Sequence, residues 1–173
     1  LITWGKPQRS ILVEAGLVQG EKSLLGEYQA NNANFKFKAK NLDYVFMSDN
    51  HGDHSLLFPL VVKRGFTGNA YVPQGFVDIF KPMALDSANI MERNALDLTK
   101  KMKRNYPPIY ESQDVYNALD KLHECNFNEK IKLDDEDISF WYDTYKETKP
   151  LGTKCIMNIK RGFFGLRYAD NVD

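Results

Sequence analysis

The sequence has little of several features that mark particular classes of protein. Only two of its 173 residues are cysteines, Cys125 and Cys155, which is too few for a disulfide framework and favours a reducing cytoplasm. Lysine and arginine total 23, and aspartate and glutamate also total 23, so the broad basic excess of many nucleic-acid-binding chains is absent. No apolar run approaches the roughly 18 residues of a membrane helix. The composition therefore predicts a cytoplasmic protein of one domain, residues 1–173, without a membrane segment.

The order of apolar patterns along the chain predicts an α/β fold. Short apolar runs predict buried strands at residues 10–13, 42–48 and 69–72, and alternation predicts another at 138–142. Residues 20–40 are polar and are expected to form a surface excursion, whereas 55–64 fit one short buried helix. Residues 75–103 predict two helices separated near Pro82. Ser112 is expected to cap a further helix.

The chemically informative segment is the polar turn that follows the second predicted strand. It holds two of the three histidines, His51 and His54, together with Asp49 and Asp53. Imidazole nitrogen and carboxylate oxygen are ligands of zinc and similar divalent ions. The alternative is a solvated polar turn whose histidines cap the helix that follows.

Residues 45–54 (VFMSDNHGDH) resemble the H-x-H-x-D-H signature of the metallo-β-lactamase fold, which also follows a buried strand. Residues 11–20 are similar to the strand and turn that carry the first acidic motif of that superfamily. Residues 59–71 and 85–90 resemble one branch, the β-CASP nucleases that process RNA and DNA, and 110–122 are placed as in that branch. The resemblance implies a layered αββα sandwich, of which this chain is expected to be the N-terminal part. We therefore expect exposed apolar surface or an extensive interface.

The resemblance also implies a two-metal site and its ligands. His51 matches a ligand of the first metal, and Asp53 and His54 match the pair that holds the second. Asp53 would also orient or deprotonate the attacking water, and Asp170 matches the carboxylate that bridges both metals. The implied cofactor is one or two zinc ions, with manganese as an alternative.

Three residues depart from the motifs of the superfamily. Glu14 stands in the first acidic motif where Asp is usual, which is a smaller change. Asp49 occupies the position of the first histidine of the signature, and Lys149 occupies the position of a later histidine. The ammonium group of Lys149 cannot bind a cation, because it has no lone pair. We hypothesise that Asp49 and Lys149 form a buried ion pair in the volume that a metal would fill. The alternative is that Lys149 is a solvated loop lysine, and a fully degenerate site would hold no metal.

The function that this resemblance implies is metal-dependent hydrolysis of phosphodiester bonds, in RNA more than in DNA. The alternative is a catalytically degenerate relative that acts as a scaffold or binding subunit, with a protein partner or a second copy of the chain. A hydrolase of lactones or thioesters is a third possibility, because one fold hosts many chemistries.

Two other groups of residues have a functional and a structural interpretation. The basic segment 100–106, with Tyr106 and Tyr110 nearby, could track a phosphate backbone and stack a base. Alternatively, its cations complement the dipole of a helix end. His123 is expected on a helix beside Cys125, as an ordinary surface residue rather than a metal ligand.

Overall fold

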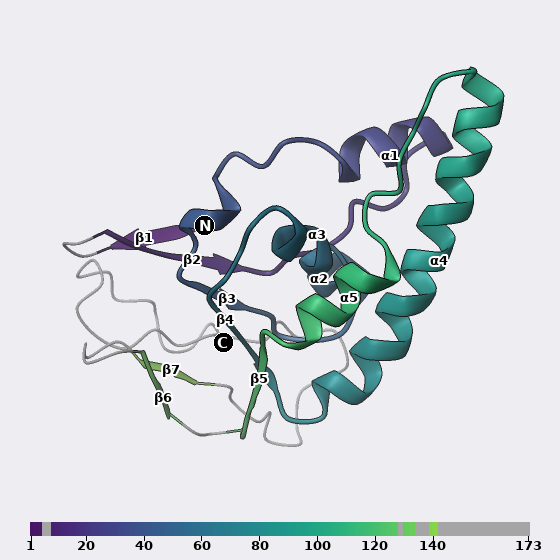
Figure 1. Ribbon diagram of the computed structural model, residues 1–173. Coiled ribbons are helices and arrows are strands. Elements are labelled where there is room, and N and C mark those ends of the chain that lie inside the picture. Colours follow the sequence, from purple (N-terminus) through teal and green to yellow (C-terminus); the bar gives the residue numbers. More distant parts are fainter. Residues whose placement is uncertain (5–7, 128–129, 134–138, 142–173) are drawn as a thin grey trace, which may run out of the picture. The chain divides into compact units, whose positions relative to one another are not determined.

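The computed structural model describes residues 1–4, 8–127, 130–133 and 139–141 (Figure 1). The chain divides into two compact units, residues 1–124 and 125–173. Each unit is described by itself below.

The first unit is built on a five-stranded sheet with the order β1-β2-β3-β4-β5. Its strands are β1 (Ile2–Trp4), β2 (Arg9–Val13), β3 (Tyr44–Phe46), β4 (Asn69–Pro73) and β5 (Leu122–Cys125). β1 is antiparallel to β2, whereas β2, β3 and β4 are parallel, with Leu12 opposite Val45 and Val45 opposite Ala70. The three strands expected in this part of the chain are confirmed. Since β3 is central, Val45 and Phe46 are completely buried.

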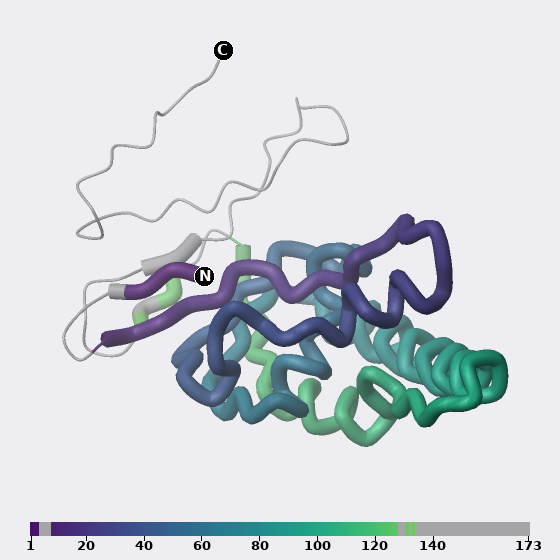
Figure 2. The backbone as a smooth tube through the Cα atoms, turned by 90° about the horizontal axis from the view of Figure 1, so that it is seen from above, coloured from purple at the N-terminus to yellow at the C-terminus, as the bar shows by residue number. Residues whose placement is uncertain are grey.

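Helices between the strands cover the sheet and complete an α/β architecture. They are α1 (Leu24–Asn31), a 3₁₀ turn (Ala39–Asn41), α2 (Gly52–Ser55), α3 (Phe58–Lys63), α4 (Phe76–Met102) and α5 (Ser112–Leu119). α5 packs against both α3 and α4, and α1 lies beside α4 at the end of the unit away from β1 (Figures 1 and 2). Phe58, Phe66, Phe80 and Tyr110 are fully buried in the core. Each such side chain contributes roughly 1.5–3 kcal/mol of burial free energy.

The expectation of a helix break near Pro82 is wrong, because α4 continues from Phe76 to Met102 with Pro82 inside it. Pro82 is exposed, so the carbonyl that loses its partner can reach water. On the opposite face, Phe80, Ala84 and Ala88 pack into the core. Tertiary packing therefore outweighs the cost of the proline.

Three further local expectations need correction. Residues 20–40, which were expected to form a surface excursion, contain the helix α1, and its N-cap is Ser23. The buried side chain of Asn31 forms hydrogen bonds with the backbone of Val18 and so fixes this helix to the preceding loop. The expected helix over 55–64 is two short helices, α2 and α3, with a proline in the first turn of α3. The cap of α5 is Glu111 rather than Ser112, in a reciprocal capping box with Asp114.

The second unit contains an antiparallel pair, β6 (Lys130–Lys132) and β7 (Ser139–Trp141), which confirms the strand expected over 138–142 for residues 139–141. Lys149, Cys155 and Asp170 lie outside the described residues. Of the helices that the structure describes, none has both the length and the apolarity needed to cross a membrane.

Candidate functional site

The carboxyl ends of β2 and β3 meet at one edge of the sheet, and the histidine turn is anchored there by backbone hydrogen bonds. The amide of Glu14 donates to Phe46 O at 2.8 Å, and the amide of Ala15 donates to His54 O at 2.7 Å. Parallel pairing brings these ends together, since both strands run in the same direction. The turn after β3 is therefore held against the segment after β2.

Gly16 is required where these two segments touch. A Cβ atom at Gly16 would lie far inside van der Waals contact with the carbonyl of Asp53, which is backbone and cannot rotate away. The next residue, Leu17, donates its amide to Gly52 O at 2.8 Å. The absence of a side chain at Gly16 thus sets the position of Asp53 and His54.

Glu14 reaches from the end of β2 towards His54. Its Oε1 accepts a hydrogen bond from the amide of Ser48 at 3.1 Å, and its Oε2 lies 3.6 Å from Nδ1 of His54. Both Oε2 and Nδ1 are buried without a hydrogen-bond partner. Burial raises the pKa of Glu14, although the Ser48 hydrogen bonds and the His54 charge oppose that rise. Glu14 also has a left-handed backbone, with φ of 62°.

The second ring nitrogen of His54 faces the other carboxylate. Its Nε2 lies 3.8 Å from Oδ2 of Asp53, at the start of α2. The Asp53 side chain is 63% exposed, against 26% for Glu14. The imidazole of His54 therefore stands between a half-buried carboxylate, which is suited to orient it, and an open one.

Asp49 and His51 form a separate local pair. Oδ1 of Asp49 accepts from the amide of His51 at 2.8 Å and lies 2.9 Å from Nδ1 of its ring. The His51 side chain is 79% exposed, and its ring centroid is 6.3 Å from that of His54. The described part of the chain thus supplies a partner for Asp49, and the Asp49–Lys149 ion pair stays a prediction.

The structure brings four of the expected site residues together in one turn: Asp49, His51, Asp53 and His54. Among described residues, no three His, Cys, Asp or Glu side chains already converge on one point. The donor atoms still suit a divalent cation, because Nε2 of His54 and Oδ2 of Asp53 form an open nitrogen–oxygen pair. Such a pair needs at least one more ligand, and Asp170 lies outside the described residues.

The sequence places Glu14 in the first acidic motif, but Glu14 was not among the expected ligands. The signal that could have found it is an acidic residue directly after an apolar strand that pairs in parallel with the strand before the histidines. A carboxylate that holds the far nitrogen of a ligand histidine fixes its tautomer and ring orientation.

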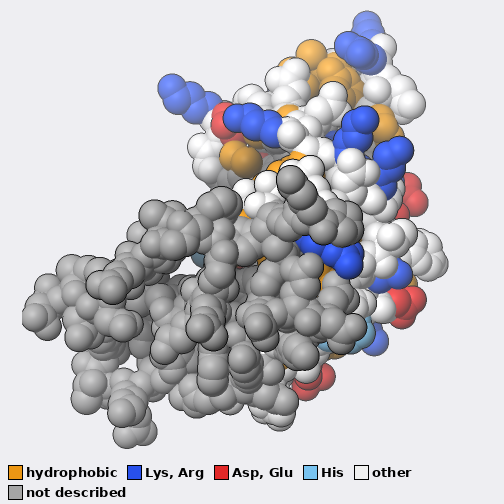
Figure 3. Space-filling model, turned by 90° about the vertical axis from the view of Figure 1, so that its left-hand side faces the viewer, with side chains coloured by type: hydrophobic (Ala, Val, Ile, Leu, Met, Phe, Trp, Pro, Cys, Tyr) orange, Lys and Arg blue, Asp and Glu red, His pale blue; other side chains and the backbone are white. Residues whose placement is uncertain are grey.

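The helix-end interpretation of the basic segment is confirmed, because Lys100 and Lys101 lie in the last turn of α4. Tyr110 and His123 are placed differently from expectation. Tyr110 is fully buried and donates its hydroxyl to Oγ of Ser87 at 2.8 Å, so it cannot stack an RNA base. The basic residues 100–104 lie at the end of α4 and directly after it. Figure 3 shows Lys and Arg side chains spread over the visible described face. His123 lies on β5 rather than on a helix, with Nε2 3.1 Å from Oδ1 of Asn69.

Comparison with known proteins gives one informative similarity. Over 125 residues the chain is 25% identical to "Ribonuclease TTHA0252" of Thermus thermophilus, a match that covers 72% of this chain. The same match covers 25% of that relative, so the chain spans about a quarter of its length. No family model matches the chain.

Proposed function

We propose that this chain is the catalytic part of a metal-dependent hydrolase that cleaves phosphodiester bonds in RNA, on a metallo-β-lactamase-like fold of the β-CASP branch. The observation that carries the proposal is the position of His54 between Glu14 and Asp53, at the edge where two parallel strands end. The similarity to a protein named a ribonuclease supports RNA as the substrate.

In this proposal Asp53 and His54, together with Asp170, hold one divalent cation, and Asp49 and His51 hold a second. A bound divalent cation would polarise the phosphodiester and lower the pKa of a coordinated water. Glu14 is a positioning residue, because its Oε2 faces Nδ1 of His54 and leaves Nε2 directed outwards. Asp53 is 63% exposed and can accept a proton from the attacking water.

A second candidate function is a binding subunit that retains the fold without catalysis. It is favoured by Asp49, which stands at a histidine position of the signature and already engages Nδ1 of His51. In that case Lys149 would complete an ion pair with Asp49, and the protein would act through a partner.

The test combines metal content with cleavage of single-stranded RNA labelled at one end. Elemental analysis of protein purified without chelator should find one or two zinc or manganese ions per chain. Asp53→Asn should abolish cleavage and remove at least one ion. Asp78→Asn is the matched control, since Asp78 is likewise an exposed carboxylate in the first turn of a helix.

The two candidate functions predict different results. A folded, metal-free protein that does not cleave RNA would overturn the hydrolase proposal and favour the binding subunit. Equal cleavage by Asp53→Asn and Asp78→Asn would overturn the role of Asp53.

A further inference from the structure

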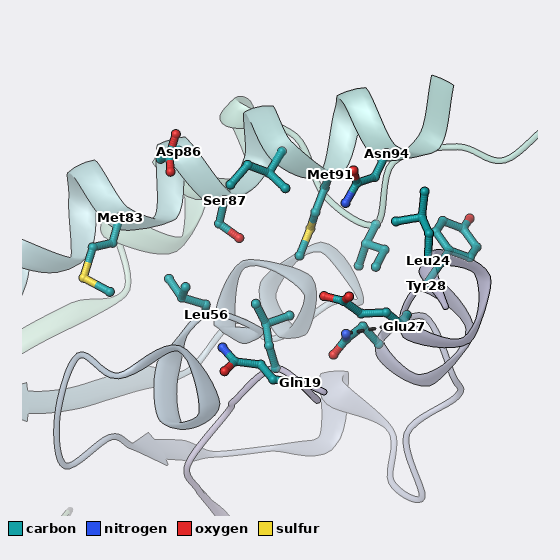
Figure 4. Close-up of a pocket in the computed structure, with 14 residues that line it drawn as sticks. Gln19, Leu24, Glu27, Tyr28, Leu56, Met83, Asp86, Ser87, Met91 and Asn94 are labelled. Atoms are coloured by element: carbon teal, nitrogen blue, oxygen red, sulfur yellow. Dashed lines mark hydrogen bonds between the residues drawn. The ribbon is translucent and has the colours of Figure 1, made fainter. Parts of the chain in front are cut away.

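A pocket of about 310 Å³ lies between α1, α4 and the loop that follows β2 (Figure 4). Its walls are mainly apolar and include Leu56, Met83 and Met91. This volume is at the lower end of the roughly 300–1,000 Å³ of small-molecule sites, so the pocket suits a compact ligand.

The pocket borders the candidate site directly. Gly52 lies between His51 and Asp53 in the sequence, and a Cβ atom at Gly52 would be 2.8 Å from Nε2 of Gln19. The same atom would lie 3.2 Å from Cδ1 of Leu56. Gln19 and Leu56 both line the pocket, so its wall is also the support of the histidine turn.

The polar groups of the pocket favour a ligand that donates hydrogen bonds. In Figure 4 the carboxylate of Glu27 points into the pocket and the hydroxyl of Ser87 faces it, whereas the carboxylate of Asp86 points away. Oγ of Ser87 accepts from Tyr110, which leaves its own proton free to donate. Among the described residues that line the pocket, none is Lys or Arg, and no described residue forms an ion pair with Glu27.

We propose that this pocket binds a nucleobase of the substrate, with guanine preferred, an inference that rests on the proposed RNA hydrolysis. Without a cationic side chain the pocket does not favour a phosphate, but its apolar walls can cover the faces of a flat base. The Glu27 carboxylate can accept two hydrogen bonds from the N1–H and N2–H groups of guanine, and the Ser87 hydroxyl can donate to a ring acceptor. Uracil offers one ring N–H between two carbonyl groups and is bound less well.

The direct test is to titrate the full chain with guanosine and, separately, with uridine, and to measure binding by calorimetry or by NMR chemical shifts. Glu27→Gln should weaken guanosine binding by about tenfold, because it removes a charge-assisted acceptor. Asp86→Asn is the matched control and should leave the affinity within about twofold, since that carboxylate points away from the pocket. Thermal unfolding should show that both variants fold, because Glu27 and Asp86 are exposed.

The outcomes separate this inference from the proposed function. RNA cleavage without measurable guanosine binding would overturn the base pocket alone. Equal guanosine affinity in Glu27→Gln and Asp86→Asn, or binding of the amine spermidine in place of guanosine, would also overturn it. Guanosine binding that Glu27→Gln weakens, in a protein that cleaves no RNA, would support the base pocket and count against the nuclease.

Discussion

Gly16 and Asp53 meet backbone to backbone, with the Cα of one against the carbonyl group of the other. This contact joins the segment after β2 to the turn that carries the candidate ligands. Neither side can yield without displacing a strand end, because the amide of Ala15 is bonded to His54 O.

Gly16→Ala should therefore lower the free energy of unfolding by about 3 kcal/mol or more, measured by urea denaturation. Gly26→Ala is the control, because Gly26 lies in α1, where a Cβ atom would meet the Ser23 side chain at 3.2 Å. Alanine favours a helix over glycine by roughly 1 kcal/mol, so the control should be as stable as the parent or more stable. A Gly16→Ala protein within about 0.5 kcal/mol of the parent would contradict the close contact.

Glu14→Gln should separate stability from metal binding. Glutamine keeps an oxygen for the Ser48 amide but removes a buried negative charge whose Oε2 has no hydrogen-bond partner. The free energy of unfolding of the metal-free protein should therefore be unchanged or higher. Zinc affinity should fall roughly 10- to 100-fold, because His54 loses the carboxylate that orients it.

Zinc affinity is measured by competition with a chelator, and unfolding by urea in the presence of that chelator. Glu21→Gln, an exposed change before α1, is the control for loss of one negative charge. Unchanged zinc affinity in Glu14→Gln would remove Glu14 from the site.

The buried hydroxyl of Tyr110 should make the fold sensitive to alkali. Burial raises the pKa of Tyr110 to about 12, against about 10 in the unfolded chain. As the pH rises, the unfolded state therefore loses this proton first. The stability that protonated Tyr110 contributes to the fold is present below pH 10 and is lost between pH 10 and about 12. The loss amounts to about 2–3 kcal/mol.

Tyr110→Phe isolates this effect from the titration of other groups. It should cost about 1 kcal/mol at neutral pH, because the hydrogen bond to Ser87 is lost. Its stability should then fall less steeply than that of the parent above pH 10. Parallel pH profiles of the two proteins, measured by urea unfolding, would contradict the prediction.

Arg64 ties α3 to the loop after α1 through its guanidinium group. It donates to Ala33 O at 2.7 Å and to Asn32 O at 2.9 Å, and it lies 4.4 Å from the centroid of the Phe35 ring. Arg64→Lys should lower the free energy of unfolding by about 1–2 kcal/mol, because lysine cannot reproduce the planar fork. Arg93→Lys, an exposed change on α4, should stay within about 0.5 kcal/mol, and equal effects of the two would contradict this role.

The sequence by itself determined the three buried strands and the histidine turn that follows the second of them. Short apolar runs mark β2, β3 and β4, since a strand buried on both faces needs a continuous apolar segment. The sequence also indicated that Asp53 and His54 are candidate metal ligands, because the two residues are adjacent and follow a buried strand.

Only the tertiary structure decided the features that depend on contacts between distant segments. Pro82 is tolerated because its face of α4 is exposed while Phe80 is buried, and Tyr110 is excluded from RNA contact because the core encloses it. The Glu14–His54 pair and the pocket at Glu27 likewise arise where separate segments pack together. Local patterns specify which residues can form a strand or bind a metal, but packing selects which of them meet.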